Sequence, residues 1–196
     1  EISRCDWSSD VCSSDLGLNT AQRWRERLGQ EREPHWDDIL QRLAPLPVQD
    51  GTYVTYEGIP DMWTRYNFEH PALAGIYGML PGEGVDRTIF EKTLDRIFDT
   101  WRFDRVWGWD FPMLAMAAAR CGRPDKAVDM LLHDSKNFRF DVHGFATGGP
   151  FPYFPSNGGL LTAVAMMAAG WDGSAGTAPG FPTGWHIKSE GFSKMQ

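Results

Sequence analysis

The longest apolar stretch of this 196-residue chain, LLTAVAMMAAG, is much shorter than the roughly 20 residues that a membrane-spanning helix needs. Basic side chains are also scarce, with 19 Lys and Arg against 26 Asp and Glu and a net charge of −7. A mildly acidic chain without basic clusters does not attract nucleic acid or an anionic membrane surface. These shortages argue against a membrane span and against a nucleic-acid partner.

Cysteine is rare too, and two of the three cysteines, Cys5 and Cys12, lie in the opening stretch EISRCDWSSDVCSSDL. This stretch has no initiator Met, no basic segment and no apolar segment, so it is not a signal peptide. It resembles read-through translation of a sequencing adapter, one frame of which encodes DWSSDVCSSDL. We therefore expect residues 1–16 to be artefactual and disordered, and the natural chain to start at about Gly17 with its upstream part missing.

Without residues 1–16 the chain has 18 basic and 22 acidic side chains, a net charge of −4, and Cys121 is its one cysteine. A single cysteine forms neither an intrachain disulfide nor a cysteine metal site, so the redox compartment cannot be inferred. No spacing of His, Asp and Glu is typical of a metal site, and we expect neither a metal nor another cofactor. The cellular location is left open, because a signal sequence would have been in the missing part.

The chain is rich in aromatic side chains, with 9 Trp, 12 Phe and 5 Tyr, which serve either as core or as stacking surface. Helical patterns follow one another, and nearly all-apolar helices over 70–80, 110–122 and 157–170 alternate with amphipathic helices over 85–101 and 123–134. Shorter helices are expected over 20–29 and 34–46, a small hairpin or loop over 47–61, and a strand-like segment over 185–192. Alternating inner and outer helices indicate an all-α fold, either an α/α toroid or an α/α solenoid. A plain bundle is the simpler alternative, but it would not need the long aromatic loop over 135–156.

Three stretches in order resemble the C-terminal half of the six-hairpin glycosidases: HPALAGIYGMLPG, WGWDFPMLAMAAARCGRPDKAVDMLL, and FDVHG followed by YFPSNGGLLTAVAMMAAGWDG. The chain is most similar to glycoside hydrolase family 95 and its relatives over residues 47–173. The resemblance implies a partial (α/α)6 toroid over 17–173, with a Gly/Pro-rich tail over 174–196 that packs back on it. It also implies a fragment of a glycoside hydrolase that cleaves an oligosaccharide by inversion. That fragment would be inactive without the missing N-terminal half, and a periplasmic or secreted location would suit the family.

Glycoside hydrolysis needs two carboxylic groups that flank the scissile bond. Three carboxylates, on Glu57, Asp61 and Asp110, lie at loop–helix junctions among aromatic residues. We favour Asp110 as the catalytic carboxylate, because the sequence VWGWD places it between tryptophans at the start of a buried helix. A pure N-cap role explains Asp110 equally well. Glu57 is the second candidate, and a solvated turn acid is its simpler interpretation.

Loop aromatics beside a carboxylate are suited to bind sugars, because aromatic rings pack on the apolar faces of pyranoses. His70 and His143 match histidines of the family and are expected to hydrogen-bond sugar hydroxyls, although a satisfied helix-end or core histidine is the simpler interpretation. Asn157 matches an asparagine of the family, as an N-cap or as a hydroxyl contact. The predicted substrate-binding residues are Trp63, His70, Trp107, Trp109, His143, Tyr153 and Asn157.

The chain departs from family 95 at the catalytic base. The family has an aspartate two residues before the position of Asn157, where this chain has Pro155. The general acid of the family would lie upstream of this sequence. Either the base has moved to Asp110 or Glu57, or the toroid binds glycans without cleaving them. A sugar isomerase or lyase of the same fold is a further alternative.

Overall fold

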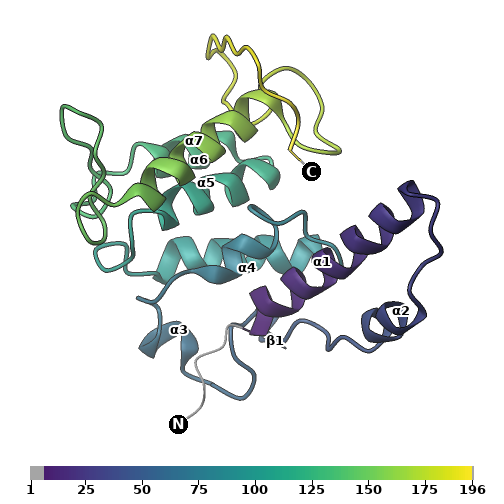
Figure 1. Cartoon of the computed structure of the whole chain (residues 1–196). Coiled ribbons are helices and arrows are strands. Elements are labelled where there is room, and N and C mark those ends of the chain that lie inside the picture. The colour runs from purple at the N-terminus through teal and green to yellow at the C-terminus, as the bar shows by residue number, and fades with distance from the viewer. Residues whose placement is uncertain (1–6, 196) are drawn as a thin grey trace.

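The computed structural model describes residues 7–195 and shows a mostly helical chain with one small two-stranded hairpin (Figure 1). This agrees with the all-α prediction. The elements, in chain order, are α1 (Trp7–Arg27), α2 (Pro34–Gln41), β1 (Val48–Gln49), β2 (Thr52–Tyr53), α3 (Met62–Arg65), the 3₁₀ helix η1 (Ala72–Ile76), α4 (Arg87–Thr100), α5 (Asp110–Arg120), α6 (Pro124–Leu131) and α7 (Phe154–Ala169). Within this part of the chain, no helix combines the length and the apolar character that crossing a membrane requires.

Helix α1 contains most of the stretch that we expected to be disordered. Residues 1–6 lie outside the described residues, whereas residues 7–16 form the first part of α1. The helix expected over 20–29 therefore begins earlier than expected, and it ends at Arg27. Adding residues to an existing helix gains one hydrogen bond for each residue fixed, so extension is easier than nucleation.

Helix α5 is the centre of the fold. All eleven of its residues are buried, as the apolar pattern predicts, and it contacts α6, α7 and η1. Pro124 begins α6 directly after a turn at Gly122, which has a φ of 70°. Helix α4 begins where Asp86 accepts hydrogen bonds from the N–H groups of Thr88 and Ile89. The amphipathic patterns predict α4 and α6 correctly.

The segment 70–80 is buried, but it is not the α-helix that its apolar pattern predicts. Only the 3₁₀ helix η1 forms, and the chain then turns through a bridge between Tyr77 and Pro81. Close packing against α5 explains the difference. A Cβ on Gly78 would lie 2.9 Å from the backbone nitrogen of Ala117, so the two backbones meet where only glycine fits.

Helix α7 differs from the prediction of a helix buried on all sides. It begins at Phe154, three residues earlier than expected, with a proline in its first turn. It packs on α5 with one face only, and its buried residues are Ser156, Ala163, Met166, Met167 and Ala168. The side chain of Leu161 is 72 % exposed. An apolar pattern alone does not tell how many faces of a helix are covered.

The β1–β2 hairpin and the C-terminal tail lie outside the helices of the fold. Strands β1 and β2 pair antiparallel around a turn in which Asp50 and Gly51 have positive φ, which confirms the predicted hairpin. The tail contacts the end of α7, where the N–H of Gly180 donates to Met167 and the N–H of Met195 donates to Gly170. Segment 185–192 is not a strand, and Gly191, with a φ of 78°, interrupts it.

Candidate functional site

His70 and Asp110, which are 40 residues apart in the sequence, form a hydrogen-bonded pair. The Nδ1 atom of His70 lies 2.9 Å from Oδ1 and 3.1 Å from Oδ2 of Asp110. The Asp110 side chain has no exposed surface, whereas that of His70 is 38 % exposed. The imidazole therefore stands between the buried carboxylate and the solvent.

The turn before α5 holds this carboxylate. Residues 107–110 form a turn in which the N–H of Asp110 donates to the carbonyl of Trp107, while the N–H of Trp107 donates back to Oδ2 of Asp110 over 2.8 Å. Asp110 is the first residue of α5, and its side chain bonds no amide further along the helix. The pure N-cap interpretation of Asp110 is therefore wrong, because the carboxylate turns back toward Trp107 and His70.

Aromatic rings surround the exposed imidazole. The ring of His70 lies 5.5 Å from that of Trp107 and 5.2 Å from that of Trp109, and the ring of Tyr153 lies 5.4 Å from that of Trp107. Trp107 is 43 % exposed, and Trp109 and Tyr153 are half-buried. We call His70, Trp107, Trp109 and Tyr153 the His70 cluster. All four were predicted as substrate-binding residues, and the fold brings them together above Asp110.

Burial and hydrogen bonding shift the pKa values of the pair. The hydrogen bond to Asp110 raises the pKa of His70 and outweighs its burial, and the charge of Glu69 adds to the effect. Burial raises the pKa of Asp110, while the bonds to His70 and to the N–H of Trp107 oppose the rise. Because one proton is shared in this contact, the two groups titrate as a coupled pair.

The turn over residues 107–110 packs against the long loop that precedes α7 through two glycines, Gly108 and Gly148. The N–H of Gly108 donates to the carbonyl of Gly148 over 3.1 Å, and the side chain of Asn137 donates to the carbonyl of Val106 over 2.7 Å. Ser156 is buried beneath the turn, and its hydroxyl donates to the carbonyl of Thr147. These supporting residues were not predicted, and the glycine between two tryptophans is the one signal in the sequence that points to them.

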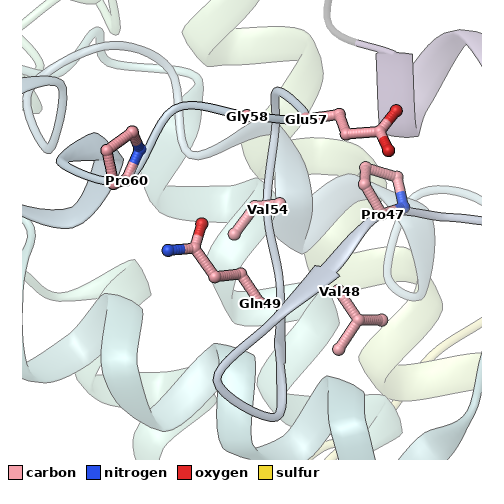
Figure 2. Close-up of a pocket in the computed structure, with 7 residues that line it drawn as sticks. All are labelled: Pro47, Val48, Gln49, Val54, Glu57, Gly58 and Pro60. Carbon is pink, nitrogen blue, oxygen red and sulfur yellow. The ribbon is translucent and has the colours of Figure 1, made fainter.

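Glu57, the second catalytic candidate, lies at a different place. It lines a pocket of about 450 Å³ beside the β1–β2 hairpin, together with Pro47, Val48, Gln49, Val54, Gly58 and Pro60 (Figure 2). No member of the His70 cluster lines this pocket. The third carboxylate, Asp61, lies 3.7 Å from the guanidinium of Arg65. The structure does not bring Glu57 and Asp110 together as a pair that flanks one bond.

Trp63 was expected in a loop, but it lies in α3 and is only 4 % exposed. Its ring meets that of Trp101 edge-on at 5.9 Å, and the guanidinium of Arg96 lies 4.5 Å from its centroid. A ring covered on these sides cannot stack on a sugar. The prediction of a substrate-binding role for Trp63 is corrected to a packing role, because the side chain is buried against Trp101 and Arg96.

His143 and Asn157 belong to the tip of the long loop rather than to the His70 cluster. His143 is exposed, and its ring lies 6.3 Å from that of Phe145. Oδ1 of Asp141 accepts the backbone N–H groups of His143 and Phe145 and so fixes the turn at the loop tip. The side chain of Asn157 donates to the carbonyl of Gly144 over 2.7 Å and so anchors the loop to α7.

Within residues 7–195, no group of three or more His, Cys, Asp and Glu side chains is arranged to hold a metal ion. No family model, curated protein or solved structure matches this chain.

Proposed function

We propose that this chain is part of a glycoside hydrolase with an (α/α)6 toroid, and that its His70 cluster binds the oligosaccharide. The observation that carries this proposal is a half-exposed imidazole, fixed by a buried carboxylate and flanked by the partly exposed rings of Trp107 and Trp109, the first of which also contacts Tyr153. The helical hairpin of α5 and α6 and the one-sided packing of α7 are compatible with a layered α/α ring.

The groups of the cluster complement the two kinds of surface that a pyranose presents. The rings of Trp107 and Tyr153 supply apolar area at low conformational cost, which suits the C–H faces of a sugar. The imidazole of His70, whose ring lies 5.5 Å from that of Trp107, supplies a polar atom for a sugar hydroxyl. Pockets that combine apolar walls with a few fixed polar groups are typical of small-molecule sites.

Cleavage needs more than this cluster contains. Among the described residues, Asp110 is the one carboxylate hydrogen-bonded to the His70 cluster, and its side chain is fully buried, so it acts on a ligand only through His70. A glycosidase requires a second carboxyl group as acid or base. The burial of Asp110 favours a second candidate function, in which the same face binds glycans without cleaving them.

Binding is tested first, with a panel of neutral oligosaccharides and titration calorimetry. We expect Trp107→Ala to weaken binding about tenfold, because one stacked ring is lost. Trp24→Ala is the matched control, since Trp24 is 56 % exposed on α1 and lies outside the cluster. Equal affinity of the two variants would contradict the proposal that the His70 cluster binds the sugar.

Cleavage is tested with the oligosaccharide that binds most tightly. New reducing ends show hydrolysis, an unsaturated product that absorbs in the ultraviolet shows a lyase, and a rearranged sugar of unchanged mass shows an isomerase. Bound but unchanged oligosaccharide would leave glycan binding as the activity of this chain alone, as expected if the second carboxyl group comes from another part of the hydrolase.

A further inference from the structure

Two groups compete for one atom of His70. The Nδ1 atom lies 2.9 Å from Oδ1 of Asp110, and the indole Nε1 of Trp109 lies 3.2 Å from the same Nδ1. The indole N–H is only a donor, so it needs the Nδ1 lone pair. An ionised Asp110 is only an acceptor, so it needs a hydrogen on Nδ1. The two bonds cannot be made at once.

Three observations favour Asp110 in this competition. Both of its oxygens lie within 3.1 Å of Nδ1, whereas the indole nitrogen is more distant. Hydrogen bonds to a charged group are about twice as strong as those between neutral groups. The carboxylate is also completely buried and would lose a hydrogen-bond partner if His70 turned to Trp109, which is costly in a medium of low dielectric.

We infer that Asp110 is a positioning residue that keeps a hydrogen on Nδ1 of His70, so that Nε2 presents its lone pair to a hydroxyl of the ligand. The identity of the ligand as a sugar rests on the proposed function, whereas the tautomer of His70 does not. Nε2 has no hydrogen-bond partner within the described part of the chain, and it is not among the buried atoms without a partner. It is therefore the accessible polar atom at the centre of the His70 cluster.

The same arrangement gives the site a pH dependence with a defined sign. The charged groups that act on His70 are Asp110 from α5 and the neighbouring Glu69, and the charge of Asp110 also acts on the Tyr153 hydroxyl. As the pH falls through the pKa of His70, Nε2 gains a proton and becomes a donor. The acceptor is therefore present above this pKa and lost below it, and removing the charge of Asp110 moves the midpoint to lower pH.

The substitution Asp110→Asn removes the charge of the side chain and keeps its size and shape. The N–H of Trp107 donates to Oδ2 of Asp110, so the amide oxygen of the variant has to occupy that place. Its NH₂ group then faces Nδ1 and requires a lone pair there. The variant should consequently hold His70 in the opposite tautomer, with the hydrogen on Nε2, as replacement of the orienting carboxylate does in a catalytic triad.

The experiment is ¹⁵N–¹H NMR of the imidazole rings in the full chain, with His70→Gln to assign the His70 signals among the five histidines. In the wild type at pH above the His70 midpoint, Nε2 is expected to have a pyridine-like shift and Nδ1 a pyrrole-like shift. In Asp110→Asn the two shifts are expected to exchange. Asp38→Asn is the matched control, because Asp38 is a half-exposed acid on the surface of α2.

A pyrrole-like Nε2 in the wild type would overturn the inference without the need for any variant. Unchanged shifts in a folded Asp110→Asn would overturn it as well. Calorimetry with the oligosaccharide that binds the wild type completes the test. Asp110→Asn should bind about tenfold more weakly, the equivalent of one hydrogen bond, whereas Asp38→Asn should bind as the wild type does. If no oligosaccharide binds the wild type, the proposed function fails, while the shifts still decide the tautomer.

Discussion

The backbones of Gly108 and Gly148 lie in direct contact at the edge of the His70 cluster. The N–H of Gly108 donates to the carbonyl oxygen of Gly148 over 3.1 Å, and a Cβ on Gly148 would lie 2.6 Å from the Cα of Gly108. This contact joins the turn that holds Asp110 to the loop that leads into α7.

Gly148→Ala is expected to lower the free energy of unfolding by about 2–5 kcal/mol. The φ of Gly148 is 100°, which disfavours a side chain, and the added methyl group would meet backbone atoms that cannot yield alone. Gly184→Ala is the control, because Gly184 also has a positive φ, of 96°, but has open space around its Cβ position. We expect this substitution to lower the free energy of unfolding by only about 1–2 kcal/mol. Urea denaturation measures both. Equal losses would show that the contact between Gly108 and Gly148 contributes nothing.

His133→Phe is expected to stabilise the protein, and more so at acid pH. The His133 ring lies 4.8 Å from the ring of Phe111 and 5.6 Å from that of Phe103, and its buried Nδ1 has no hydrogen-bond partner among the described residues. Replacing an unsatisfied buried polar atom by an apolar ring should add about 1 kcal/mol at pH 8.

The pH dependence of this variant follows from the burial of His133. Burial lowers the pKa of His133 in the folded state, so the unfolded chain binds more protons below the ordinary value of about 6.5. The stability that the neutral ring contributes is present above this value and lost as the pH falls. The difference in the free energy of unfolding between His133→Phe and the wild type, measured by urea denaturation, should therefore increase toward pH 5. His186→Phe, at an exposed position in the tail, should change stability by less than about 0.5 kcal/mol. If this difference in the free energy of unfolding decreases toward pH 5, the burial of His133 does not lower its pKa in the folded state.

Leu161→Glu is expected to increase the solubility of the protein and reduce its self-association. Leu161 is 72 % exposed on α7, on the same helix as the exposed side chains of Phe154 and Val164, and contiguous apolar surface promotes association. Leu132→Glu is the matched control, because Leu132 is also 72 % exposed but follows α6. Sedimentation velocity over a range of concentrations compares the two. If the wild type is monomeric at every concentration, the exposed face of α7 does not promote association.

The helices that the sequence predicts best are those whose pattern is complete within one segment. Alternation of apolar and charged residues defines α4, and an uninterrupted apolar run defines α5. The segment 70–80 fails as an α-helix because its backbone must approach Ala117 at Gly78, a contact between segments distant in sequence. The exposed face of α7 was missed for the same reason, since its pattern says nothing of the neighbours that cover it.

The site was predicted residue by residue but not as an arrangement. Asp110 was selected for its local surroundings and His70 for its match to a histidine of the family, and only the fold shows that they are bonded to one another. Local reasoning placed Trp63 on a sugar-binding surface, although it is buried against Trp101, and it grouped Glu57 with Asp110, although Glu57 lines another pocket. A sequence pattern shows which side chains suit a chemistry, while their mutual distances depend on how α5 packs against η1.

Helix α5 is buried over its whole length and carries the carboxylate of Asp110 on its first residue. The polar pair is therefore ordered by the same packing that forms the core, before any ligand arrives. The imidazole of His70 is already fixed before a ligand binds to it, so little conformational entropy of the protein would be lost on association. Selectivity at such a site comes from the match between the ligand and a fixed shape, and a ligand of another shape is not accommodated by local rearrangement.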